Sequence, residues 1–64
     1  MENERFNLSL RRFLKEVGIS SQQEIEHVVR ERKLAGKGKL KVKMVLTAAD
    51  TDLRHEVNGE IDLD

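Results

Sequence analysis

The apolar residues of this 64-residue chain change their spacing once, near Lys39. Before that point they recur every three or four residues, which is the period of an amphipathic helix. After it they alternate with polar residues, which is the period of a strand with one buried face. A single change of period restricts the chain to helices first and strands second. The sequence therefore predicts an α+β fold.

A first helix is predicted over residues of about 3–17. Its apolar stripe consists of Phe6, Leu10, Phe13, Leu14 and Val17. Asn3 is suited to be the N-cap, because its side chain can accept a hydrogen bond from a free backbone N–H. Gly18 is expected just past the end of the helix, where a residue with positive φ is common. These two residues bound the first helix.

A second helix is predicted over residues of about 21–34. It begins at Ser20 or Ser21, each of which is followed three residues later by Gln or Glu, as in a capping box. Its end is expected between Lys33 and Ala35, because two glycines follow closely. The prediction for this half of the chain is thus two helices separated at Gly18.

Two strands, over about 39–47 and about 52–63, are predicted to form an antiparallel hairpin. Folding them about Ala49 and Asp50 brings apolar residues together on one face and opposite charges together on the other. The charged pairs in this register are Lys43 with Glu56 and Lys39 with Glu60. A register shifted by two residues, with a four-residue loop, keeps the same faces and stays open. The full architecture predicted is two helices packed on one face of a C-terminal hairpin (ααββ), as a single domain over 1–64.

Asn58 and Gly59 form a dipeptide that is typical of hairpin turns. A turn here would mix the apolar and the charged faces of the hairpin. The sequence therefore predicts a bulge or bend in the last strand at this point, and not a turn.

Charge is divided along the chain. Residues 1–43 hold 11 bases and 6 acids, a net of +5, whereas residues 44–64 hold 1 base and 6 acids, a net of −5. The pairing of a lysine-rich strand with an acidic one accounts for most of this division. No cysteine is present, so neither a disulfide nor a thiolate metal site can reinforce so short a chain. Formation of a homodimer is the reinforcement that stays open.

The location predicted is the cytoplasm. The longest apolar run is three residues, far below the roughly 20 that a membrane span needs. The amino terminus carries acids where a signal peptide has a basic region. We therefore expect no membrane span and no export.

No catalytic, cofactor-binding or metal-binding set is predicted, and we expect no enzyme. The serines are explained by helix positions, and His27 is expected to face solvent. His55 and Glu56 point to opposite faces of a strand and cannot hold one ion together. His55 is the one polar group among the apolar positions of the hairpin. It is predicted to be half-buried, with a single hydrogen bond or a pH-sensing role.

The function predicted is that of a small binding module. Its candidate partner surface lies on the first helix, opposite the apolar stripe, and consists of Arg5, Leu8, Arg11, Arg12 and Lys15. The expected partner is an unidentified protein of acidic character, and an anionic membrane surface and a nucleic acid stay open as alternative ligands of the same residues. A solvated helix face is the simplest alternative for this cluster.

A helix-turn-helix nucleic-acid binder, with Gly18 in the turn, is a further alternative. The position four residues before Gly18 is usually small in this motif but is Leu14 here. Two positions after Gly18 that are usually buried and apolar are Glu24 and His27. The two phenylalanines both lie on the apolar stripe and are not available to stack on bases. Nucleic acid is therefore disfavoured as a partner. A subunit that functions only as a homodimer is the third alternative.

Three stretches of the chain, residues 6–26, 42–47 and 52–61, resemble a family of short bacterial proteins catalogued as a domain of unknown function. They cover more than half of the chain in a specific order. The resemblance implies a shared fold and a bacterial setting. It implies no activity, substrate or catalytic residue.

Overall fold

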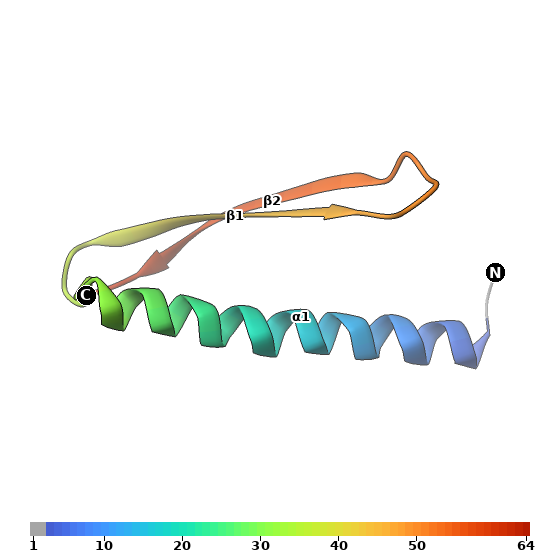
Figure 1. Ribbon diagram of the computed structural model, residues 1–64, viewed down its shortest axis with the longest axis horizontal. Coiled ribbons are helices and arrows are strands. Elements are labelled where there is room, and N and C mark those ends of the chain that lie inside the picture. Colours follow the sequence, from blue (N-terminus) through green and yellow to red (C-terminus); the bar gives the residue numbers. More distant parts are fainter. Residues whose placement is uncertain (1–2) are drawn as a thin grey trace. The chain divides into compact units, whose positions relative to one another are not determined.

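A computed structural model describes residues 3–64 as one helix followed by a two-stranded antiparallel hairpin (Figure 1). Met1 and Glu2, part of the acidic amino terminus discussed above, lie outside the described residues. The helix, α1, spans Glu4–Glu31, and the strands are β1, Lys39–Thr47, and β2, Arg54–Asp62. The α+β class and the order of elements are confirmed. The chain divides into two compact units, Met1–Lys33 and Leu34–Asp64, and each is described by itself. The prediction of one domain stays a prediction.

The prediction of two helices is wrong, because α1 runs without a break through Gly18. Gly18 is not among the glycines with positive φ, so it does not terminate a helix. Ser20 is not an N-cap either, since its hydroxyl donates to the carbonyl of Glu16 at 2.8 Å inside the helix. A glycine in a helix costs only about 1 kcal/mol relative to alanine. Continuous backbone hydrogen bonding outweighs that cost here.

Both ends of α1 have identifiable caps. Asn3 has extended backbone angles, and its Oδ1 accepts from the backbone N–H of Phe6 at 2.6 Å, which confirms the predicted N-cap. At the other end Arg32 is the C-cap, and its N–H donates to the carbonyl of Val28 at 3.0 Å. Lys33 follows with a φ of 53°, in the left-handed conformation that commonly ends a helix. The helix therefore ends slightly earlier than predicted.

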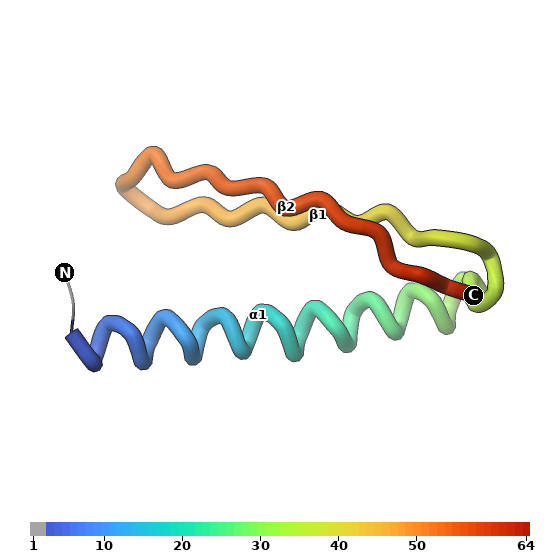
Figure 2. Tube along the Cα trace, turned by 180° about the vertical axis from the view of Figure 1, so that it is seen from behind, coloured from blue at the N-terminus to red at the C-terminus, as the bar shows by residue number. Residues whose placement is uncertain are grey.

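The hairpin adopts the register that is shifted by two residues from the preferred prediction. Met44 pairs with Val57 and Val42 with Gly59, and a loop of residues 48–53 joins the strands (Figure 2). The tighter register requires a two-residue turn at Ala49 and Asp50, and both favoured turn types need a positive φ at the first of them, Ala49. Only Asp50 has it, at 61°, and alanine strongly disfavours that conformation.

The loop and the open end of the hairpin supply hydrogen bonds that stabilise this register. In the loop, Thr51 Oγ1 donates to the carbonyl of Ala48 at 2.8 Å and accepts from the N–H of Leu53 at 3.2 Å. At the open end, the N–H of Gly36 donates to the carbonyl of Leu63 at 2.6 Å, and the N–H of Leu63 donates to the carbonyl of Gly38 at 2.8 Å. The strand ladder thus continues beyond β1 and β2.

The predicted charge pairs Lys43–Glu56 and Lys39–Glu60 are wrong in detail, because the shift places each lysine opposite the residue two positions further along β2. Lys39 now lies opposite Asp62, and Lys41 lies opposite Glu60. The shift by two preserves both faces of each strand, so Lys39 and Lys41 still meet acids, whereas Lys43 now lies opposite Asn58. The segregation of charge is therefore compatible with either register.

The prediction that Asn58 and Gly59 do not form a turn is confirmed. The bulge expected at this point is wrong. Both residues pair within the uninterrupted ladder, opposite Lys43 and Val42. A Cβ added to Gly59 would lie 3.8 Å from Cγ2 of Val42, which is an ordinary contact. The strand therefore accommodates this glycine without distortion.

Proton NMR provides a direct check of the register. We expect cross-strand NOEs between Val42 and Gly59 and between Met44 and Val57, since these residues lie opposite one another. Strong NOEs between Val42 and Val57 would instead show that the tighter register is populated.

Candidate interaction surfaces of the helix

The candidate partner surface lies on one face of α1. At about 100° per residue, its five members fall between about 140° and 260° from Phe6 around the helix axis. All five are exposed, and Leu8 is 58% exposed. We call this surface, formed by Arg5, Leu8, Arg11, Arg12 and Lys15, the basic face. A single continuous helix therefore holds the predicted residues together on one side.

The cations of the basic face have no ion-pair partner among residues 3–64. Within residues 3–64 an ion pair joins Arg54 to Glu56, both in the hairpin, at 3.1 Å. Arg11 and Lys15 are four residues apart, a spacing at which like charges repel. An acidic group brought from outside would relieve this repulsion.

Ile19 is a member of the basic face that the sequence analysis missed. In the two-helix prediction it belongs to the connection after Gly18. In the continuous helix it lies about 220° from Phe6, in line with Leu8 but three turns, or about 16 Å, further along the axis, and is 49% exposed. The signal that would have revealed it is its spacing of eleven residues from Leu8, which is close to three whole helical turns. The basic face therefore has two exposed apolar residues among its cations.

The opposite face of α1 is apolar and also largely exposed. None of the residues 3–64 is fully buried. Leu10, Phe13 and Leu14 are 43%, 51% and 52% exposed, whereas Val17 and Ile25 are half-buried. An isolated helix or a two-stranded sheet is only marginally stable in water. Each unit therefore depends on further burial of its apolar face.

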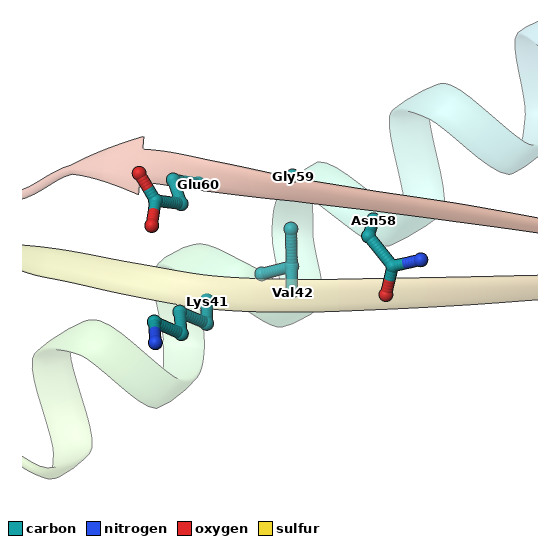
Figure 3. Close-up of a pocket in the computed structure, with 5 residues that line it drawn as sticks. All are labelled: Lys41, Val42, Asn58, Gly59 and Glu60. Atoms are coloured by element: carbon teal, nitrogen blue, oxygen red, sulfur yellow. The ribbon is translucent and has the colours of Figure 1, made fainter.

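A hollow in the hairpin is lined by residues of both strands. Its volume is about 280 Å³, and its lining residues are Lys41, Val42, Asn58, Gly59 and Glu60 (Figure 3). It lies where the absent side chain of Gly59 leaves space beside Val42. The hollow is wide open and holds no nucleophile paired with a base.

His55 is exposed within the hairpin unit, and the prediction that it is half-buried stays a prediction. The register places it opposite Leu46 and not opposite Met44. All residues of β2 from Arg54 to Glu60, including His55, are exposed. His27 is exposed as predicted. No group of three or more His, Cys, Asp or Glu side chains gathers within residues 3–64 in a way that could hold a metal ion.

The helix-turn-helix alternative is contradicted by α1. That motif needs two helices at a large angle, joined by a short turn. Here the residues on both sides of Gly18 belong to one helix. The described part of the chain therefore has no separate recognition helix after Gly18 that could enter a DNA groove.

The fold defines the class of this protein as a small α+β domain with one long helix and an antiparallel two-stranded hairpin. Within the described part of the chain, no helix combines the length and the apolar character that crossing a membrane requires.

The chain belongs to the Family of unknown function DUF6494, whose model matches residues 1–64. The predicted resemblance to a domain of unknown function is thereby confirmed. The bacterial setting and the cytoplasmic location stay predictions. No match was found among curated proteins or among solved structures.

Proposed function

We propose that this protein is a small non-enzymatic interaction module that binds an acidic protein through the basic face of α1. The observation that carries this proposal is the composition of that face. Four cations without ion-pair partners in residues 3–64 share one side of α1 with two exposed apolar residues, Leu8 between the cations and Ile19 one turn beyond Lys15. Cations provide attraction and orientation, and the apolar residues provide burial at the centre of a contact.

A protein partner fits this face better than nucleic acid does. The phenylalanines lie on the opposite side of α1 and cannot stack on bases from the basic face. The positive charge is also confined to the first half of the helix, because residues 18–31 hold three acids and one base. An extended phosphate backbone would meet repulsion beyond Ile19, whereas a short acidic helix with a few leucines would not.

Binding can be measured with a defined acidic probe. The probe is a fluorescently labelled helical peptide made of glutamate and leucine, followed by fluorescence anisotropy. The variant replaces Leu8, Arg11, Arg12 and Lys15 by glutamine, which preserves helix propensity. We expect at least about tenfold weaker binding, because three of the four cations and one of the two apolar residues of the basic face are removed.

The matched control removes three cations from other exposed places, with Arg30, Lys37 and Lys43 each replaced by glutamine. It changes the net charge equally and should bind the peptide within about twofold of the unmodified protein. Equal weakening by both variants would show that only net charge matters. Tighter binding of a single-stranded oligonucleotide or of phosphatidylglycerol vesicles than of the peptide would contradict a protein partner.

A further inference from the structure

The apolar face of α1 has a regular period along its whole length. Its core positions follow the spacing 4, 4, 3, 4, 4, 3 and are Phe6, Leu10, Leu14, Val17, Ser21, Ile25 and Val28. This is an eleven-residue repeat of 3.67 residues per turn, which stays nearly in line on a helix of 3.6 residues per turn. In the continuous helix the apolar stripe consists of these seven positions, six of them apolar and the seventh Ser21, and Phe13 flanks them. It extends along roughly 33 Å of α1, at about 1.5 Å per residue.

The apolar stripe is nearly symmetric about Val17. Phe6 and Val28 are equally distant from it, and Leu10 and Ile25 differ by one residue in their distance from it. When two copies lie antiparallel with Val17 at the centre, Phe6 meets Val28 and Leu10 meets Ile25. Leu14 then meets Ser21, so two larger side chains of one half, Phe6 and Leu14, meet smaller ones of the other, and Leu10 meets Ile25, which is equal in size. This alternation of large and small residues favours close packing.

Charge also favours the antiparallel arrangement of two copies. The first half of α1, residues 4–17, holds four bases and two acids, a net of +2. The second half, residues 18–31, holds one base and three acids, a net of −2. Antiparallel pairing brings opposite signs together at both ends, whereas parallel pairing brings like signs together. Antiparallel pairing thus has both shape and charge in its favour.

We infer that the apolar stripe of α1 binds a second copy of this chain, antiparallel, about a two-fold axis at Val17. Such an interface is the same on both copies, as the symmetry of the stripe requires. It supplies burial that the helical unit lacks by itself, since none of the described residues of α1 is fully buried. The inference goes beyond the proposed function, because it uses the opposite face of α1. The basic faces of the two copies stay free at opposite ends of the pair.

Single cysteines provide a test of both the face and the direction, since the natural chain has none. Val17→Cys copies should cross-link to each other under mild oxidation, because residue 17 meets itself. Phe6→Cys copies mixed with Val28→Cys copies should form the mixed disulfide. Lys15→Cys, on the opposite face, is the matched control and should cross-link at least about tenfold more slowly than Val17→Cys.

Cross-linking, together with light scattering, can overturn the inference in two ways. Efficient cross-linking of Phe6→Cys with itself, without the mixed product, would show a parallel pair. Light scattering of the unmodified protein must also give twice the chain mass of 7.4 kDa at sufficient concentration. A mass of one chain at every concentration, together with equal cross-linking of Val17→Cys and Lys15→Cys, would exclude the pair. Loss of the pair with retained peptide binding would leave the proposed function of the basic face intact.

Discussion

Proline at position 18 is expected to lower the free energy of unfolding by about 3 kcal/mol, and alanine at the same position to raise it by about 1 kcal/mol. Gly18 lies in the interior of α1, with no atom within 4 Å of the position that a Cβ would take. Proline removes a backbone hydrogen bond and collides with the preceding turn. Alanine removes the excess flexibility of glycine and meets no obstacle. Urea unfolding followed by circular dichroism measures both changes.

The matched control for this prediction is Gly36→Ala. Gly36 has a φ of 79°, a conformation that costs alanine roughly 1–2 kcal/mol. The same substitution is therefore expected to destabilise the protein at position 36 and to stabilise it at position 18. A destabilising effect of alanine at both positions, with proline tolerated at 18, would indicate a helix that ends at Gly18.

Aspartate in place of Val17 is expected to weaken self-association by at least about 100-fold, which corresponds to about 2.7 kcal/mol. In the antiparallel pair the two carboxylates would meet at the two-fold axis, among apolar side chains. Each would lose its hydration and repel the other. The measurement is the concentration dependence of the mass in sedimentation equilibrium.

Mixing two variants separates repulsion at the axis from a general loss of structure. An equimolar mixture of Val17→Asp and Val17→Lys should associate more strongly than either variant alone, because opposite charges then meet. Gln23→Asp adds a similar charge away from the apolar stripe and should leave self-association within about twofold. Association of Val17→Asp as strong as that of the unmodified protein would place the contact elsewhere.

The basic face shows how much of a candidate site can be predicted from local pattern. Arg11, Arg12 and Lys15 lie together on α1 because their spacing requires it in any helix. Ile19 was missed, because its position on this face depends on the helix continuing through Gly18. The burial predicted for His55 stays a prediction, because strand alternation gives the face of a residue and not what covers that face.

Local sequence was sufficient for the order of elements, the faces of the strands and the cap at Asn3, since each depends on residues close together in the chain. It was insufficient at two points. Strand alternation has a period of two, so a shift by two residues leaves every face unchanged, and the conformations of Ala49 and Asp50 decide the register. Gly18 is compatible with both a helix end and a helix interior, at a difference of about 1 kcal/mol. The choice between them falls to the hydrogen bonding and the apolar stripe of the complete helix, which are properties of all 28 residues together.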